Sequence, residues 1–364
     1  MTATIPLFPE LATEAERRVL TAGELTAGLF RYGTGVPALR LRNGRGEVVV
    51  LPWMGGMIWS AQFDGVDLAM QSGFDAPRPA STIAETYGCF AFHSGLLRNG
   101  VPSAEDDHPA HGEFPCAAMD RAFLECGEDE GGAFLRLVSV REHVMGFGAH
   151  YLAQPRVTLR PGDSLFDIGL SVRNLSGKPM ELMYMCHVNF AFVPGGRCVQ
   201  PVPFTPERTV VRRAVPAHVR PDPGYLALID DLARDPARMA VLGEPELYDP
   251  EQVFYLKRPG TDARGDTHLM LQRPQGDGFA LSYPPAAFPH TVRWILNDPD
   301  QKVAAFALPS TCEPEGYAAE QRKGHVRQLP PGGQAEFRVR AGYLDAGGAG
   351  RMASLIQGLE ETRP

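Results

Sequence analysis

The stretch Ser164-Leu165-Phe166-Asp167-Ile168-Gly169-Leu170-Ser171-Val172-Arg173 decides the fold class of this chain of 364 residues. From Phe166 onward, apolar side chains alternate with polar side chains or glycine. Because successive side chains of a strand point to opposite faces of a sheet, this period of two predicts a β-strand that buries one face. A turn at 174–178 and a second apolar strand up to His187 follow directly.

Segments of the same character recur along the chain, and turn residues separate them at short intervals. We expect strands at 39–42, 47–51, 57–63, 133–141, 149–159, 253–256, 268–271, 279–283, 291–296, 303–308 and 335–344. Helical periodicity is rare, and we expect short helices at 13–18, 225–234 and 352–361. Strands never alternate with long helices, which disfavours a parallel α/β sheet. The pattern is typical of an all-β, antiparallel sandwich or barrel.

The composition is compatible with one large β domain or with two medium domains. Hydrophobic residues make up 44% of the chain and charged residues 21%, which is enough apolar material for a sizeable core. The 39 glycines and 33 prolines are spread along the chain, as many tight turns require. We predict a single domain over residues 1–364, with an N-terminal extension at 1–38. The proline-rich segment 200–251 is predicted to be an insertion.

Several classes of protein are disfavoured. The formal net charge of -8 argues against a nucleic-acid partner, since such proteins usually concentrate Lys and Arg on one face. No apolar run approaches the roughly 18 residues of a membrane span, and residues 1–10 lack the pattern of a secretory leader, so we expect no membrane partner and a cytoplasmic location. The six cysteines form no CxxC pair, which favours buried thiols over a zinc or disulfide framework.

Titratable side chains gather in the segment 106–115, which contains His108, His111 and three carboxylates. Two other segments far along the chain also carry such groups, with His187 in the first and Glu313 in the second. If the fold brings His111, His187 and Glu313 together, the site has two imidazoles facing a carboxylate. That set is suited to moving protons on a hydroxylated molecule near neutral pH.

Each of these residues also has a plainer interpretation. A loop histidine such as His111 is often only solvated, and a lone histidine in an apolar strand, such as His187, is often a core residue. Asn189 lies on the same side of that strand and favours a functional role for His187. Glu315 or Glu320 could replace Glu313 as the carboxylate. A metal site around His108 is less favoured than a solvated acidic loop, so we predict no metal.

Four short motifs in order resemble the aldose 1-epimerase (galactose mutarotase-like) superfamily, in a divergent branch. They are Gly95-Leu96-Leu97-Arg98-Asn99-Gly100, Pro109-Ala110-His111-Gly112, Cys186-His187-Val188-Asn189-Phe190 and Cys312-Glu313-Pro314. The resemblance covers roughly residues 40 to 345. The chain departs from the family pattern at Ala110, at Glu113 and at Glu315, and the last departure leaves the choice of catalytic carboxylate open.

The resemblance implies an antiparallel β-supersandwich with an open cleft, and an isomerase that interconverts the α and β anomers of a free sugar without a cofactor. Carried over by motif, Glu313 is the base at O1, His187 is the acid at O5, and His111 steadies the developing charge. Arg98 binds sugar hydroxyls with its planar fork of donors.

Further residues complete the predicted sugar site. Asn189 helps to orient it, Glu315 is a second carboxylate, and Trp294 and Tyr283 are aromatic candidates for packing on the sugar ring. The expected partner is a small sugar, with the protein a monomer or a homodimer. Two alternatives remain open: a non-catalytic carbohydrate-binding domain, and a metal-dependent sugar isomerase that uses His93, His108, His111 and Glu113.

Overall fold

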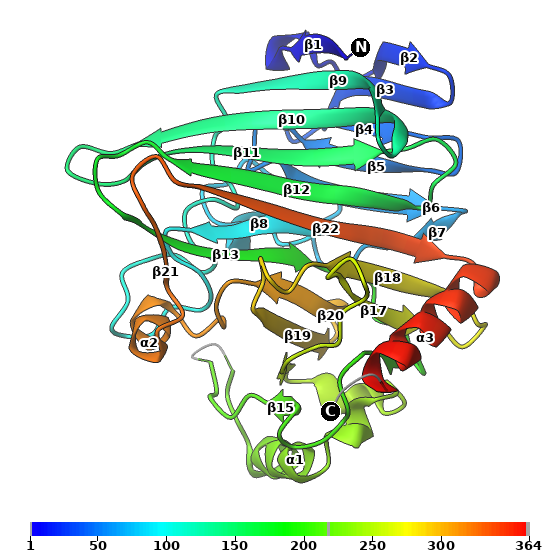
Figure 1. Ribbon diagram of the computed structural model, residues 1–364, viewed down its shortest axis with the longest axis vertical. Helices are drawn as coiled ribbons and strands as arrows, with labels where there is room; N and C mark the ends of the chain where they lie inside the picture. Colours follow the sequence, from blue (N-terminus) through cyan, green and yellow to red (C-terminus); the bar gives the residue numbers. More distant parts are fainter. Residues whose placement is uncertain (1, 217–218, 362–364) are drawn as a thin grey trace.

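The computed structural model describes residues 2–216 and 219–361, and within them two large antiparallel sheets lie against each other (Figure 1). The first sheet has nine strands. Their order across the sheet is β1 (Ala3–Leu7), β9 (Arg121–Asp129), β10 (Gly132–Val144), β11 (His150–Leu159), β12 (Leu165–Asn174), β22 (Gln334–Leu344), β18 (Gly278–Tyr283), β17 (Thr267–Gln272) and β14 (Arg197–Val199).

The second sheet has thirteen strands among the described residues. Their order is β15 (Thr209–Val211), β16 (Gln252–Leu256), β19 (His290–Asn297), β20 (Lys302–Ser310), β13 (Met180–Val188), β8 (Ala91–Leu96), β6 (Met57–Phe63), β5 (Gly46–Leu51), β4 (Pro37–Arg42), β3 (Leu25–Arg31) and β2 (Arg17–Ala22), while β21 (Arg327–Leu329) pairs with β13 and β7 (Val66–Asp67) with β6. The all-β antiparallel architecture expected from the alternation is confirmed.

Helices are few. The described residues form α1 (Pro223–Arg234), α2 (Tyr317–Lys323), α3 (Ala346–Glu361) and the 3-10 turns η1 (Pro9–Leu11), η2 (Ile83–Thr86), η3 (Pro236–Met239) and η4 (Pro245–Tyr248). The helices expected at 225–234 and 352–361 are confirmed by α1 and α3. In the part of the chain that the structure describes, no helix is both long and apolar enough to span a membrane.

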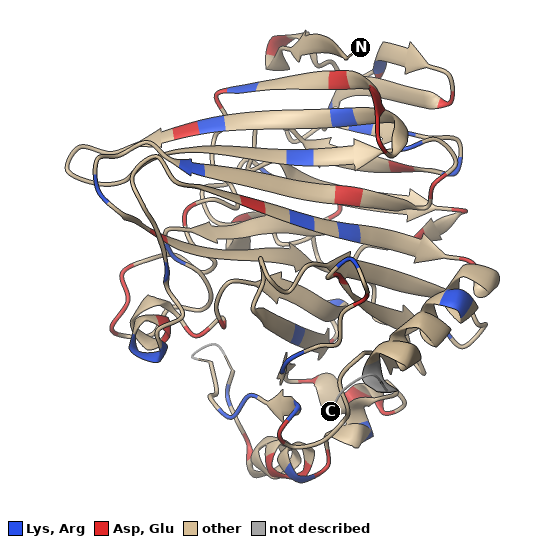
Figure 2. Cartoon of the chain, in the orientation of Figure 1, with Lys and Arg blue, Asp and Glu red and all other residues tan. Residues whose placement is uncertain are grey.

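The alternation in β12 has the expected structural result. Phe166, Ile168 and Leu170 are buried in the core between the sheets. On the opposite face of the strand, Asp167 lies across from Arg340 of β22, with 3.6 Å between Oδ1 and Nη1. Figure 2 shows charges of both signs interspersed along the strands of this outer face. The nine-stranded sheet therefore has one buried face and one solvated face.

The helix expected at 13–18 is wrong. Strand β2 begins at Arg17 and pairs with β3, where Arg17 lies opposite Leu29. A helix of so few residues is marginal in water, because its first turn fixes several backbone angles for a single hydrogen bond. Pairing with β3 therefore outweighs the local preference.

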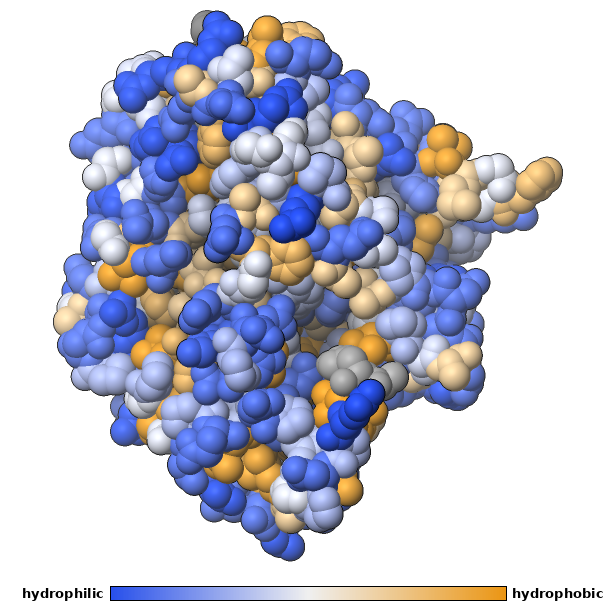
Figure 3. All heavy atoms as spheres, turned by 180° about the vertical axis from the view of Figure 1, so that it is seen from behind, coloured by the Kyte–Doolittle hydropathy of each residue, from blue (hydrophilic) through white to orange (hydrophobic). Residues whose placement is uncertain are grey.

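The turn between β10 and β11 projects from the body of the molecule (Figure 3). Its apolar side chains Val144, Met145 and Phe147 are exposed. These three residues contribute nothing to the core, whereas Ala149 at the end of the turn packs against it.

Candidate active site

Strand β13 divides its side chains between the core and a cavity. Tyr184, Cys186 and Val188 belong to the core between the sheets. Met185 and His187 point to the opposite face and line a cavity of about 570 Å³. Pockets for small ligands typically measure about 300–1,000 Å³. The cavity therefore lies on the face of the thirteen-stranded sheet that is turned away from the core.

The loop between β8 and β9 carries His111 into the same cavity. The Gly95 N–H donates to the His111 carbonyl at 2.9 Å, and the His111 N–H donates to the Gly100 carbonyl at 2.8 Å. The turn has positive φ at His111 (63°) and at Gly112 (80°). A Cβ on Gly112 would lie 2.0 Å from the Arg98 carbonyl oxygen. Only glycine fits after His111, because the backbone approaches so closely.

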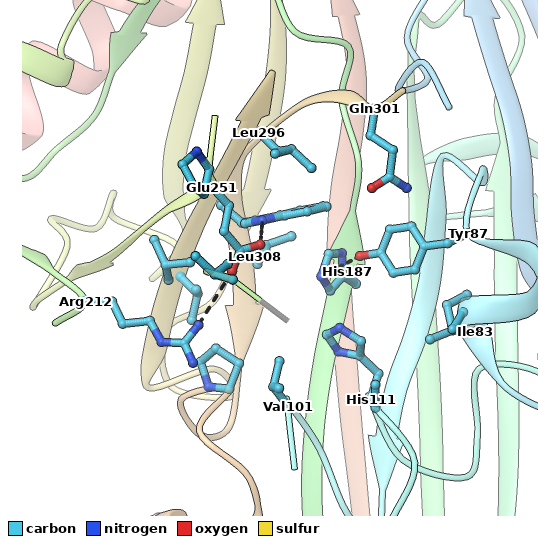
Figure 4. A pocket seen from close by; sticks show the side chains of 18 of the residues that line it. Ile83, Tyr87, Val101, His111, His187, Arg212, Glu251, Leu296, Gln301 and Leu308 are labelled. Carbon is cyan, nitrogen blue, oxygen red and sulfur yellow. Dashed lines mark hydrogen bonds and ion pairs between the residues drawn. The ribbon is translucent and has the colours of Figure 1, made fainter. Parts of the chain in front are cut away.

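The two imidazoles lie side by side in the cavity (Figure 4). Their ring centroids are 4.9 Å apart and their planes are nearly perpendicular, at 86°. Phe92 stacks on His187 with 4.5 Å between centroids, and the Tyr87 hydroxyl lies 3.4 Å from His187 Nε2. The aromatic neighbours hold the rings in place, so the structure brings together the two histidines that the sequence predicted.

Asn189 fixes the tautomer of His187. The Asn189 amide nitrogen donates to the Cys89 carbonyl at 3.0 Å, which leaves its Oδ1 as an acceptor. This oxygen lies 2.8 Å from His187 Nδ1, so Nδ1 carries the hydrogen. In the neutral imidazole, Nε2 is then the acceptor nitrogen. It faces the cavity, and the Tyr87 hydroxyl donates to it at 3.4 Å.

A similar chain of contacts orients His111. Its Nδ1 lies 3.0 Å from the Ser94 hydroxyl oxygen, and that hydroxyl donates to Asn99 Oδ1. The Asn99 amide nitrogen in turn donates to Cys312 Sγ at 3.4 Å. Because the Ser94 proton is already used, its oxygen accepts from Nδ1–H of His111. Both histidines therefore hold Nδ1–H toward buried groups.

Burial lowers the pKa of His187 well below its usual value, and the charge that His111 can carry lowers it further. The hydrogen bond to Asn189 opposes this effect but does not cancel it. His187 is therefore a neutral imidazole near pH 7. Protonation of His111 makes protonation of His187 still less favourable, so the pair takes up protons one at a time.

The opposite wall of the cavity carries a carboxylate (Figure 4). Glu251 accepts a hydrogen bond from the Trp294 indole N–H at 2.6 Å and lies 3.9 Å from the Arg212 guanidinium. The Trp294 ring centroid lies 5.7 Å from that of His187, so the indole links the imidazoles to the carboxylate. Arg212 and Glu251 both come from 200–251, the predicted insertion.

Glu251 is not among the site residues expected from the sequence. No motif surrounds it, and the only available signal was its position directly before the strand expected at 253–256. Trp294, chosen as an aromatic candidate, does line the cavity with the two histidines.

Glu313 does not join the histidines, which corrects the expected arrangement. It lines a second cavity, of about 350 Å³. The Lys257 ammonium donates to Glu313 Oε1 at 2.5 Å, and the Lys323 ammonium donates to Oε2 at 2.8 Å. Burial opposes ionisation, but these two hydrogen bonds prevail and lower the pKa of Glu313 to about 2. The carboxylate is drawn to the two ammonium groups, and hydrogen bonds from them occupy both of its oxygens.

Three other predicted site residues also lie elsewhere. Arg98 places its guanidinium 3.7 Å from the centroid of the Tyr317 ring and pairs with Glu181. Tyr283 is buried in the core, and its hydroxyl bonds to that of Thr291. Glu315 accepts from Arg212 Nη2 at 3.1 Å and from the Tyr255 hydroxyl, so it supports the cavity wall from behind.

The residues of the metal-dependent alternative point in different directions. His93 is buried against Tyr184, and Glu113 accepts the backbone N–H groups of Leu96 and Leu97 at 3.0 Å. His108 bonds to the carbonyl of its own neighbour, at 2.8 Å. These histidines and Glu113 therefore do not converge on one point.

Among the described residues, one group of three has the spacing of metal ligands: Glu313, Glu320 and His325. Its carboxylates already accept hydrogen bonds from Lys323, at 2.8 and 2.7 Å. The ammonium of Lys323 thus already binds both carboxylates of this group.

The sequence profile described as Domain of unknown function (DUF4432) matches residues 33–342. The chain belongs to the DUF4432 family. No curated protein sequence matches it significantly.

Solved structures show the same fold at low sequence identity. A Klebsiella pneumoniae protein named provisionally as an aldose 1-epimerase superposes with a TM-score of 0.80 at 15% identity, covering 100% of this chain and 97% of its own. A galactose mutarotase-like protein from Clostridium acetobutylicum gives 0.59 at 12% identity, covering 89% and 100%. One from Lactobacillus casei gives 0.52 at 12% identity, covering 84% and 99%. The expected galactose mutarotase-like supersandwich is confirmed.

Proposed function

We propose that this DUF4432 protein is an isomerase that interconverts the α and β anomers of a free sugar in the larger cavity, without a cofactor. The observation that carries the proposal is the pair of adjacent imidazoles with fixed tautomers, His111 and His187. The names of the structural relatives, an aldose 1-epimerase and galactose mutarotase-like proteins, support the same reaction class.

The chemistry requires an acid and a base close together. Ring opening removes the proton of the O1 hydroxyl and delivers a proton to O5, after which rotation about C1–C2 and reclosure invert the anomeric centre. O1 and O5 are both bonded to C1, so the two catalytic groups must reach atoms that are close neighbours. Imidazole centroids 4.9 Å apart satisfy that condition.

The protonation states indicate which imidazole is the base and which is the acid. Neutral His187 has its electron pair on Nε2, so it can accept the O1 proton but has none to give to O5. We therefore assign His187 as the base and His111, in its imidazolium form with a hydrogen on Nε2 as well as on Nδ1, as the acid, the reverse of the role that the resemblance implies for His187. The protons return in the opposite sense when the ring closes.

The opposite wall holds the sugar in position. Glu251 accepts hydrogen bonds from sugar hydroxyls, and its own orientation depends on the Trp294 N–H and on the charge of Arg212. The Trp294 ring offers an apolar face to the C–H groups of a pyranose. In this assignment Glu251 binds the substrate and does not transfer a proton to or from the anomeric centre.

The test is anomer exchange measured by saturation-transfer NMR on a panel of free aldoses, in a weakly catalytic buffer. We expect faster exchange for at least one sugar, lowered on the order of 10²- to 10⁴-fold in His187→Ala and in His111→Ala. Glu313→Gln is the matched carboxylate control for Glu251→Gln: only the Glu251 variant should raise KM. If sugars bind without any faster exchange, the protein is a carbohydrate-binding domain and the proposal is wrong.

A further inference from the structure

The floor of the larger cavity is an apolar cluster separate from the core. The members that line the cavity come from four adjacent strands, β13, β20, β19 and β16, and are Met185, Leu308, Val292, Leu296 and Val253. Neighbouring strands lie about 4.8 Å apart, so the floor is about 14 Å wide. These side chains do not connect the two sheets, because the core between the sheets is a different cluster.

Few polar groups from these strands reach the cavity. Its lining residues on β13, β16, β19 and β20 include only His187 and Trp294 as possible hydrogen-bonding side chains. The Trp294 N–H already donates to Glu251. A ligand hydroxyl lying on the aliphatic part of the floor would lose water without gaining a partner, which is unfavourable.

The charges around the cavity oppose an anionic ligand. Within residues 2–216 and 219–361, the charged residues that line it are two arginines and three acids: Arg212, Arg220, Asp249, Glu251 and Asp298. Arg212 is already paired with Glu315, a fourth acid behind the wall. The local balance is negative, so a phosphate or sulfonate group on the sugar would be repelled.

The floor begins beside the catalytic pair. Met185 precedes His187 by two residues on the same face of β13. The exocyclic C6 group of an aldohexose is attached to C5, the carbon next to O5. The floor spans four strands and is wider than a pyranose ring, so the C6 group of a sugar that reaches both imidazoles also lies against apolar side chains.

We infer that the substrate is a neutral 6-deoxyaldose, whose C6 methyl group packs on the floor formed by Met185, Leu308 and the side chains beside them. This inference rests on the proposed function and names the substrate class of the same site. A hexose would place a hydroxyl on that surface, and a sugar 6-phosphate would add charge that the surrounding acids repel.

The experiment compares matched sugars in the exchange assay. The pairs are 6-deoxy-D-galactose against D-galactose, 6-deoxy-D-glucose against D-glucose, and 6-deoxy-L-mannose against L-mannose, with D-glucose 6-phosphate as the anionic sugar. We expect a higher kcat/KM for the 6-deoxy member of the best pair, by about 10²-fold, the size of effect that one misplaced hydroxyl has in an apolar pocket. The phosphate should show no faster exchange.

A parent hexose or the 6-phosphate that reacts as well as the 6-deoxy sugar would overturn the inference and leave the proposed function standing. If no sugar exchanges faster, the proposed function fails. Dissociation constants of the same pairs, from NMR line broadening, then decide the inference: tighter binding of the 6-deoxy member supports it, and equal or weaker binding overturns it.

A substitution of nearly equal volume tests whether the apolar floor is the surface that favours the 6-deoxy sugar. Val292→Thr adds a hydroxyl to the floor, so it should shift the ratio of kcat/KM values toward the hexose by about 10-fold. Val303→Thr is the matched control, because Val303 belongs to the same apolar cluster but does not line the cavity. An unchanged ratio in Val292→Thr, or the same shift in both variants, would count against the floor as the specificity surface.

Discussion

A buried histidine outside the proposed site gives a quantitative prediction for stability against pH. His93 is 2% exposed, and its Nδ1 lies 2.8 Å from the Tyr184 hydroxyl in the core. Burial lowers its pKa from 6.5 to about 4. As the pH falls, His93 of the unfolded chain therefore takes up a proton near pH 6.5, whereas His93 of the folded protein takes it up only near pH 4. The contribution of His93 to the unfolding free energy is fully present above pH 6.5 and is lost as the pH falls toward 4.

The size of the loss follows from the two pKa values. With a pKa of 6.5 unfolded and about 4 folded, the unfolding free energy falls by about 3 kcal/mol between pH 7.5 and pH 4. This is a large part of the 5–15 kcal/mol typical of a folded domain. His187 acts in the same direction, since its pKa is also lowered by burial.

The assay is urea unfolding followed by tryptophan fluorescence at several pH values from 4 to 7.5. In His93→Asn, which keeps a polar atom near the position of Nδ1, the loss of stability on acidification should be smaller than in the wild type by about 3 kcal/mol. Effects of His187 and of the carboxylates are common to both proteins and cancel in the difference.

Tyr184→Phe is the control. It should retain the wild-type pH dependence, because burial and not the hydrogen bond to Tyr184 lowers the pKa of His93. Equal pH dependence in the wild type and in His93→Asn would refute the reasoning.

Three further predictions concern the site and its support. Gly112→Ala should lower the unfolding free energy by about 1–3 kcal/mol in urea titrations, because its Cβ would meet the Arg98 carbonyl at 2.0 Å; an unchanged midpoint would show that the turn can move. Asn189→Leu should slow anomer exchange about 10²-fold without unfolding, since it releases the tautomer of His187; a rate within twofold of the wild type would contradict this. Glu313→Gln should lower thermal stability, because Lys257 and Lys323 lose the charge of Glu313 and Lys323 keeps only that of Glu320; a gain in stability would contradict that reasoning.

The fold was largely predictable because one local rule dominates it. Apolar and polar side chains alternate along strands such as β12, and the buried residues of that strand follow the alternation. The error at 13–18 arose where the local signal was weak and pairing with β3 decided the structure. In a short segment, a distant strand can outweigh local preference.

The site was predictable only in part. His111, His187 and Asn189 belong to ordered motifs, and the structure brings the two histidines together with Asn189 beside them. Glu313 also belongs to a motif, yet its direction depends on Lys257, 56 residues away, and on Lys323, neither of which the motif contains.

Glu251 is the opposite case, because no motif contains it and yet it lines the cavity. It lies in a proline-rich segment without periodicity, and only the fold places it across from the imidazoles beside Trp294. Long-range ion pairs and hydrogen bonds set the direction of such side chains, and a single sequence does not reveal them.

The central claim is that His111 and His187 act together as acid and base, and a double-mutant cycle on anomer exchange tests it most directly. We expect His111→Ala and His187→Ala each to lower kcat on the order of 10²- to 10⁴-fold. The double variant should be little slower than the slower single variant, because residues that act as a unit are not additive. Losses that multiply in the double variant, or single variants with wild-type rates, would contradict the account.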